Sequence, residues 1–395
     1  KYNKMKELNN LVDELKLSNM FSNVTLKMLD STNGTVNIIL ELDDSKYKDW
    51  YSFGADKEDY KCWWGIKDLP SVNELTKSYI DFIYGDKDSV IKYWMKKGVV
   101  GYRLDVADEL PDSFIEGIRN AMKETDDDSV LIGEVWEDAS NKISYGEKRK
   151  YLFGSELQSV MNYPYRDSVI DFMKGKISAM ELVSICMHYM ENYPVENFYS
   201  TLNILDSHDK ERVLTILGDV EEKDIPDNQK KNYRLDDTKR LLAKRRLKVL
   251  STMQFTIVGV PCIYYGDEVG LEGFRDPYNR GTYPWGHEDV DILSHYIDIT
   301  SLRSKSDVLK KGDLKLISMG EHVFGYIREY KGKKMICLFN RAIFDNEICH
   351  IELDLSDDKD IDRYKNLLDT DNEWHIENNK LISDMKPLSY IILGK

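Results

Sequence analysis

Gly101-Tyr-Arg-Leu-Asp-Val-Ala-Asp-Glu109 joins a short apolar strand pattern to a group of acidic residues. Arg103 and Asp105 are two residues apart, so on a strand their side chains face the same side. A guanidinium next to a carboxylate favours its ionised form, which suits Asp105 to nucleophilic attack. A structural salt bridge explains the same pair equally well.

A second strand pattern ends in Leu131-Ile-Gly-Glu-Val-Trp-Glu-Asp138. Glu134 lies at the end of an apolar run, where desolvation suits a carboxyl group to proton donation. Trp136, two residues further on, shares its face and could stack on a sugar ring. The alternative is a glutamate that only hydrogen-bonds a loop.

The third such segment is Leu205-Asp-Ser-His-Asp-Lys-Glu-Arg212. His208 and Asp209 supply a donor and an acceptor, which can bind neighbouring hydroxyls of a sugar. Metal sites and helix N-caps use the same residue types. Because the sequence has no HExxH motif and no second histidine cluster, we do not expect catalytic zinc.

Outward from these segments, apolar runs alternate with amphipathic helical patterns over the first 300 residues. This alternation predicts a parallel sheet with helices outside it. The predicted strands are Val24–Leu29, Val99–Leu104, Val130–Val135, Leu157–Asn162, Leu202–Asp206 and Val258–Tyr264. The predicted helices are Ser71–Lys97, Asp112–Lys123, Tyr165–Lys174, Ala179–Asn192 and Asn228–Thr256.

After Ser306 the pattern changes to short alternating strands, which predicts an antiparallel β domain. Its predicted strands are Leu314–Ile317, Val323–Glu329, Lys334–Asn340, Ile348–Leu353, Trp374–Ile376 and Tyr390–Leu393. The domain prediction is therefore a catalytic α/β domain over 1–305 and an all-β domain over 306–395.

Composition narrows the class of protein. The 395 residues are 42% hydrophobic and 32% charged, enough apolar material for a folded core. A net charge of -15 argues against nucleic-acid binding.

The five cysteines show no CxxC pair, which favours reduced thiols and a cytoplasmic protein. The uncharged run 249–266 contains Pro261 and polar residues, so we read it as a helix end and a strand and expect no membrane contact.

Together, strand-Arg-x-Asp, strand-Glu-x-Trp and strand-Ser-His-Asp resemble the α-amylase family of glycoside hydrolases, which have a (β/α)₈ TIM barrel with the active site at the strand C-termini. Further matching segments are Leu69–Asn73, Gly259–Glu268, Asp276–Arg280 and Tyr283–Gly286. The resemblance extends from about residue 20 to the end. It is closest to the neopullulanase, cyclomaltodextrinase and maltodextrin-glucosidase branch.

The resemblance implies roles for individual residues. Asp105 would be the nucleophile, Glu134 the general acid/base and Asp209 the transition-state stabiliser. The implied substrate-binding residues are Arg103, Glu109, Trp136, His208, Asp276 and Arg280. Candidate stacking platforms are Trp64, Trp136 and Trp285.

The sequence also departs from the family pattern. The segment Lys27–Gly34 keeps a strand and Asp30 but lacks the family's histidine after its third strand. Only one strand is predicted before Gly101 where the family has three, so we expect a barrel lacking its first strands, with a loop excursion at about 31–73. Exposed edges would then make the isolated chain weakly active and unstable.

The leading hypothesis is a retaining hydrolase that cleaves α-1,4 or α-1,6 glucosidic bonds in maltodextrins, cyclodextrins or pullulan. The alternatives are an inactive carbohydrate-binding remnant and a transglycosylase. We expect no cofactor. A Ca²⁺ ion near the acidic stretch Asp43–Asp59 stays open, although that stretch lacks calcium-loop spacing and is better read as a solvated loop. Homo-oligomerisation also stays open.

Overall fold

A computed structural model describes residues 9–14, 24–30, 36–42, 47–55, 59–344, 346–358 and 360–395. The chain forms two compact units. The first unit comprises Lys1–Val100 and Leu110–Ser129, and the second comprises Gly101–Glu109 and Val130–Lys395.

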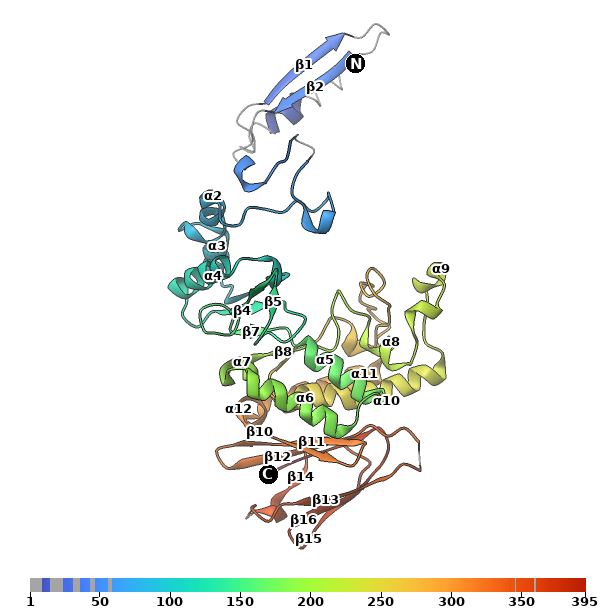
Figure 1. Ribbon diagram of the computed structural model, residues 1–395. Coiled ribbons are helices and arrows are strands. Elements are labelled where there is room, and N and C mark those ends of the chain that lie inside the picture. The colour runs from blue at the N-terminus through green and yellow to red at the C-terminus, as the bar shows by residue number, and fades with distance from the viewer. Residues whose placement is uncertain are drawn as a thin grey trace. The chain divides into compact units, whose positions relative to one another are not determined.

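The first unit contains a two-stranded hairpin (Figure 1). Strand β1 (Val24–Asp30) pairs antiparallel with β2 (Val36–Leu42), with Val24 opposite Leu42 and Asp30 opposite Val36. The expectation that Val24–Leu29 is a parallel barrel strand is therefore wrong. A second β-branched run follows after Asn33-Gly34, a dipeptide typical of hairpin turns, and it provides the nearest partner. It also places a strand within the predicted loop excursion.

The rest of the first unit combines an irregular segment, which includes an antiparallel bridge between Tyr51 and Val72, with short helices and 3₁₀ and π turns. The predicted helix Ser71–Lys97 is divided into three pieces, and Asp112–Lys123 forms one helix that is two residues longer. The elements are η1 (Lys48–Trp50), η2 (Trp63–Gly65), α2 (Lys77–Ile80), η3 (Asp81–Gly85), α3 (Val90–Lys96) and α4 (Asp112–Thr125).

The α/β part of the second unit is built on parallel strands. Five predicted strands form with shorter bounds, as β3 (Gly101–Leu104), β4 (Val130–Gly133), β7 (Ser159–Val160), β8 (Leu202–Asn203) and β9 (Val260–Pro261). β3 pairs with β4, β4 with β7, and β8 with β9, all in parallel. A parallel bridge between Met161 and Leu202 links the two sets. Because all five run the same way, their C-terminal ends lie along one edge.

Helices follow these strands as the alternation predicts. The helix bounds are η4 (Ala107–Glu109), α5 (Tyr163–Met173), α6 (Ala179–Asn192), α7 (Val195–Ser200), α8 (Val213–Leu217), η5 (Glu222–Asp224), α9 (Asp227–Lys230), α10 (Asp237–Thr256), η6 (Asp267–Val269), α11 (Val290–Lys305) and α12 (Asp307–Lys311). A small hairpin joins β5 (Ile143–Ser144) to β6 (Glu147–Lys148). At the start of α6, Ser178 and Glu181 form a reciprocal capping box, which fixes where this helix begins.

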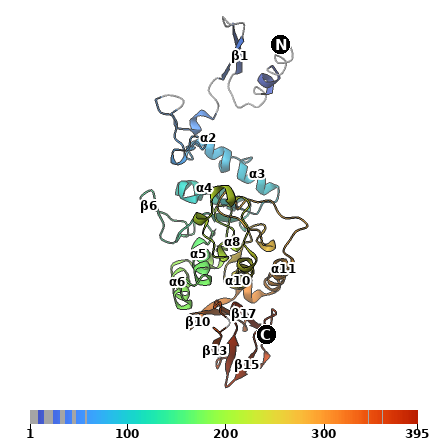
Figure 2. The same cartoon turned by 90° about the vertical axis from the view of Figure 1, so that its right-hand side faces the viewer.

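Two antiparallel sheets make up the C-terminal part (Figures 1 and 2). The larger has the order β10-β11-β12-β17-β14 and the smaller β13-β16-β15. Side chains of both sheets, including Leu338, Ile391, Ile351 and Leu381, form one buried apolar cluster. The bounds are β10 (Asp313–Met319), β11 (Val323–Tyr330), β12 (Lys333–Asn340), β13 (Cys349–Asp354), η7 (Ile361–Arg363), β14 (Lys365–Asn366), β15 (Trp374–Glu377), β16 (Lys380–Met385) and β17 (Ser389–Gly394).

Buried polar contacts attach the larger sheet to the end of α10. Arg328 is fully buried and donates to the carbonyl oxygens of Thr256 and Gly312, both at 2.8 Å. The Tyr326 hydroxyl donates to the Met253 carbonyl at 3.1 Å. Carbonyls in the last turn of a helix lack intrahelical partners, and Arg328 supplies a donor to that of Thr256, the last residue of α10.

Within the ranges described, no helix combines the length and apolar composition that crossing a bilayer requires. All five cysteines are free thiols.

The shared core of the two C-terminal sheets yields a stability prediction. Leu338 is fully buried in it, so Leu338→Ala should lower the free energy of unfolding by about 2–5 kcal/mol in urea titrations. Leu241→Ala, at an exposed position on α10, is the control and should change it by less than about 0.5 kcal/mol. Equal effects of the two substitutions would contradict this account of the core.

Candidate active site

The three predicted catalytic carboxylates all follow parallel strands of the second unit. Asp105 comes directly after β3 and Glu134 directly after β4. Asp209 lies six residues after the end of β8, in a segment without regular secondary structure. The strand ends that the sequence predicts to carry the chemistry therefore share one edge.

Arg103 joins two of the carboxylates. Its Nη1 is ion-paired and hydrogen-bonded to Asp105 Oδ1, and its Nη2 lies 3.0 Å from Glu134 Oε2. The second contact is an ion pair without hydrogen-bond geometry. Because one guanidinium contacts both groups, the two carboxyl groups lie within a few ångström of each other. Their exposure differs sharply: 71% of the Asp105 side chain is exposed, against 4% for Glu134.

Glu134 is held on both oxygens. Oε2 accepts a hydrogen bond from the Val106 amide at 2.9 Å, and Oε1 accepts one from Trp136 Nε1 at 2.8 Å. Its own amide donates to the Leu104 carbonyl at 3.0 Å, which ties the end of β4 to the end of β3. Oε2 therefore faces Arg103 and Asp105, whereas Oε1 faces Trp136.

Trp136 is half-exposed, and two neighbours share one face of its indole. Tyr163 stacks on it with ring centres 5.1 Å apart, and Lys210 Nζ lies 4.0 Å from the indole centre and 5.4 Å from the Tyr163 ring. If Lys210 Nζ and the Tyr163 ring lay on opposite faces of the indole, the distance between them would exceed their distances from the indole centre by several ångström. The other face is left free of both. Burial lowers the pKa of Lys210 and raises that of Tyr163 to about 12.

Asp209 belongs to a second group of polar residues. Its Oδ2 lies 3.2 Å from His208 Nε2, and its Oδ1 lies 3.9 Å from Arg280 Nη2. Arg280 is also paired with Asp276 at 3.0 Å. Burial raises the pKa of Asp209, the His208 charge opposes that shift, and the Glu134 charge adds to it.

The remaining predicted residues make other contacts. Glu109 ends the short helix η4 and accepts a hydrogen bond from the Tyr145 hydroxyl at 2.5 Å. Trp285 is 79% exposed, with its ring centre 4.4 Å from that of Tyr283. Trp64 is exposed in the first unit, where it stacks on Trp63. Trp136, in contrast, contacts a predicted catalytic residue, Glu134.

A buried acidic pair underlies the Asp209 segment, and sequence reasoning missed it. Asp206 and Asp267 are both buried, and Arg212 Nη1 lies 3.1 Å from Asp267 Oδ1. Burial raises the pKa of each carboxyl, and the charge of Asp206 raises the pKa of Asp267 further. Asp206 Oδ2 accepts the Val213 amide at 2.8 Å, whereas Oδ1 has no donor among the described residues. A proton shared between the two carboxyl groups would satisfy it.

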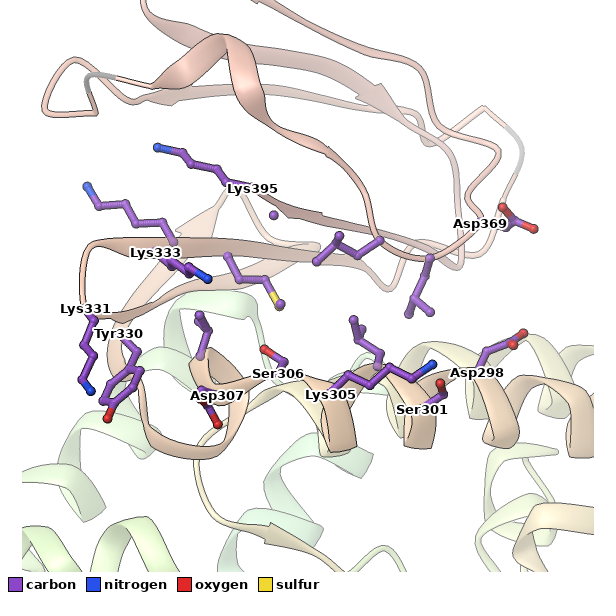
Figure 3. A pocket seen from close by; sticks show the side chains of 17 residues that line it. Asp298, Ser301, Lys305, Ser306, Asp307, Tyr330, Lys331, Lys333, Asp369 and Lys395 are labelled. Carbon is purple, nitrogen blue, oxygen red and sulfur yellow. The ribbon is translucent and has the colours of Figure 1, made fainter.

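Binding of a metal ion needs several liganding side chains close together. The described residues include no group of three or more His, Cys, Asp or Glu side chains arranged to hold a metal ion. Of the stretch Asp43–Asp59, residues 43–46 and 56–58 lie outside the described ranges. A cavity of about 690 Å³ lies elsewhere, between α11, α12 and the C-terminal strands, and Lys305, Lys333 and Tyr330 contribute to its lining (Figure 3).

Comparison with known proteins identifies the family. Residues 48–315 match the sequence model of the alpha-amylase catalytic domain, and the chain belongs to the alpha-amylase family. The match begins after β2.

Individual relatives are similar over most of this chain. An amylopullulanase of Thermoanaerobacterium thermosulfurigenes is 32% identical over 383 residues, which cover 88% of this chain and 20% of that protein. A cyclomaltodextrinase of Thermoanaerobacter pseudethanolicus is 31% identical, covering 82% of this chain and 53% of that protein. This chain thus spans between about a fifth and a half of these relatives. The Nostoc punctiforme debranching enzyme has the same fold, with a TM-score of 0.72 at 22% identity, covering 89% of this chain and 70% of that chain.

The buried acidic pair predicts a pH dependence of stability. Because the pKa values of Asp206 and Asp267 are raised on folding, the native state binds more protons than the unfolded state above about pH 4, where carboxyl groups normally titrate. The free energy of unfolding therefore falls as the pH rises above about 4. Asp206→Asn keeps an acceptor for Val213 and leaves Asp267 to pair with Arg212, so its melting temperature should fall less between pH 5 and pH 7.5 than that of the wild type.

Asp298→Asn, at an exposed carboxylate on α11, is the matched control and should leave the wild-type pH dependence unchanged. If Asp206→Asn and the wild type lose the same number of degrees between the two pH values, the shared proton does not exist.

Proposed function

We propose that this chain carries the active site of a retaining α-glucan hydrolase, which cleaves α-1,4 glucosidic bonds, or α-1,6 bonds, in maltodextrins, cyclodextrins or pullulan. One observation carries the proposal: Arg103 contacts both the exposed carboxylate of Asp105 and the buried carboxyl group of Glu134. Retaining glycosidases need such a pair about 5 Å apart. Similarity to cyclomaltodextrinases, neopullulanases and amylopullulanases supports the substrate class.

In the first step, Asp105 attacks the anomeric carbon while Glu134 donates a proton to the departing glycosidic oxygen. The ion pair and hydrogen bond with Arg103 hold the Asp105 carboxylate in place for this attack. In the second step, Glu134 takes a proton from water, and the resulting hydroxide displaces Asp105 from the sugar. Both oxygens of Glu134 accept hydrogen bonds, so its carboxyl group is already oriented before substrate binds.

The other residues surround this pair. Asp209 and His208 bind sugar hydroxyls and stabilise the positive charge that develops on the ring. Asp276 and Arg280 support Asp209 from one side. The free face of Trp136 stacks on a sugar, since Tyr163 and Lys210 occupy the other face, and the sugar lies on the leaving-group side, because the Oε1 oxygen of Glu134 faces the indole.

Several finer statements belong to the same proposal. The domain boundary at residue 305/306, a barrel that lacks its first strands, and a C-terminal β-sandwich stay predictions, and the core shared by two sheets supports the last of these. A function without a cofactor and a cytoplasmic location also stay predictions, and homo-oligomerisation and a Ca²⁺ ion stay open.

The competing function is an inactive carbohydrate-binding remnant. Incubating the purified 395-residue chain with maltotriose, pullulan and a cyclodextrin, followed by product analysis, separates the two. Cleavage of any of them excludes the binding-only alternative. Binding of all three without any product would contradict the proposed function.

We predict that Asp105→Asn and Glu134→Gln each abolish turnover and leave the fold intact. Loss of a nucleophile or a general acid lowers kcat by several orders of magnitude, about 10²–10⁴-fold for the acid alone. Steady-state rates with maltotriose and far-UV circular dichroism measure the two effects. Glu137→Gln, an exposed glutamate on the same loop, is the matched control. A variant that keeps more than about a tenth of the wild-type rate would remove that residue from the mechanism.

A further inference from the structure

The side chain of Asn279 contacts the backbone on both sides of Asp209. It is fully buried, and its Nδ2 lies 2.7 Å from the His208 carbonyl oxygen, 2.8 Å from that of Lys210 and 3.2 Å from that of Ser207. An amide nitrogen has two hydrogens, so at least one of them is shared between acceptors. The two shortest contacts are those to the residues that flank Asp209.

The orientation of the Asn279 amide is fixed. Its Oδ1 is buried and has no hydrogen-bond partner in the described part of the chain. A flipped amide would place this oxygen against three carbonyl oxygens and leave them without a donor, and an unpaired buried polar group is costly. The side chain therefore gives up one hydrogen bond in order to make the contacts on the Asp209 side.

The backbone of Asn279 is held in turn by a buried cation. Its carbonyl oxygen accepts a hydrogen bond from Arg212 Nε at 2.9 Å. Arg212 is almost fully buried, is paired with Asp267, and lies 4.0 Å from the centre of the Tyr264 ring. Asn279 thus connects a rigid buried network to a segment that has no strand or helix hydrogen bonds of its own.

Among the described residues, the comparably buried Tyr163 also contacts this segment, but through a side chain: its hydroxyl lies 3.4 Å from Ser207 Oγ. Arg280 Nε contacts the His208 carbonyl at 3.4 Å, but its side chain is 45% exposed. The Asp209 amide donates to Ser207 Oγ at 3.1 Å, which is a contact within the segment itself.

We propose that Asn279 is a positioning residue, which acts on catalysis by holding the Ser207–Lys210 backbone so that the Asp209 carboxylate stays in its productive place. The inference rests on the proposed function of Asp209. Asn279 does not reach the substrate or the Asp209 carboxylate, so its effect on the reaction passes through the backbone of the segment.

A double-mutant cycle tests this route. The cycle comprises the wild type, Asn279→Ala, Asp209→Asn and the double variant, assayed for fluoride release from α-maltosyl fluoride, a substrate that needs no general acid to expel its leaving group. In the wild-type background we expect Asn279→Ala to lower kcat/KM by about 10–100-fold, since a misplacement of about 1 Å can cost 10²-fold. In the Asp209→Asn background it should have almost no further effect.

An equal loss of kcat/KM in both backgrounds would overturn the proposal, because Asn279 would then act independently of Asp209. Absence of any loss in the wild-type background would also overturn it. Asn192→Ala, at an exposed position on α6, is the control and should match the wild type. Asn279→Ser replaces the alanine variant if that chain does not fold.

Hydrogen–deuterium exchange supplies a readout that does not depend on turnover. Peptides covering Ser207–Arg212 should exchange faster in Asn279→Ala, while peptides from β11 and β12 should be unchanged. Unchanged exchange in the 207–212 peptides would overturn the positioning role. Faster exchange in Asn279→Ala, together with a wild type that releases no fluoride, would support the positioning of the segment and refute the proposed function instead.

Discussion

The contact of one guanidinium with two carboxyl groups is the constraint on which the site depends. Asp105 and Glu134 would repel each other if both were ionised and unpaired. Arg103, on β3, reduces that repulsion because its guanidinium contacts both carboxyl groups. The register of β3 and β4, in which Arg103 lies opposite Ile132, brings the ends of the two strands level, so that Asp105 and Glu134 emerge side by side. The two groups differ in exposure: Asp105, the attacking carboxylate, is exposed, and Glu134 is buried.

The other half of the site is built in a different way. Asp105 and Glu134 are placed by strand ladders, whereas Asp209 lies on a segment fixed by side chains. Asp206, Arg212 and Asn279 are all buried there, and each binds backbone groups of the segment or of its neighbours. Buried polar networks of this kind hold one conformation strongly when their groups are satisfied. The position of Asp209 therefore depends on the protonation of the buried acidic pair and on these hydrogen bonds more than on the geometry of the sheet.

Local patterns account for what could be predicted from the sequence. Apolar runs that end in Arg-x-Asp, Glu-x-Trp or Ser-His-Asp predicted which residues meet at the strand ends, and Arg103, Asp105, Glu134 and Trp136 do lie together. The β1 prediction failed, because an apolar β-branched run suits parallel and antiparallel pairing alike and only its partner decides. Asn279 and Asp267 were not predicted, since their partners lie 55–72 residues away. The periodicity of apolar residues in a sequence carries no information on contacts between residues so far apart in the chain.

The stereochemistry of cleavage tests the central claim most directly. If Asp105 attacks the anomeric carbon and water later displaces it, two inversions return the starting configuration. Proton NMR during the first minutes of maltodextrin cleavage, before mutarotation, should then record the α-anomer as the first product. Initial release of the β-anomer would mean a single displacement by water, and the pairing of Asp105 with Glu134 through Arg103 would have another purpose.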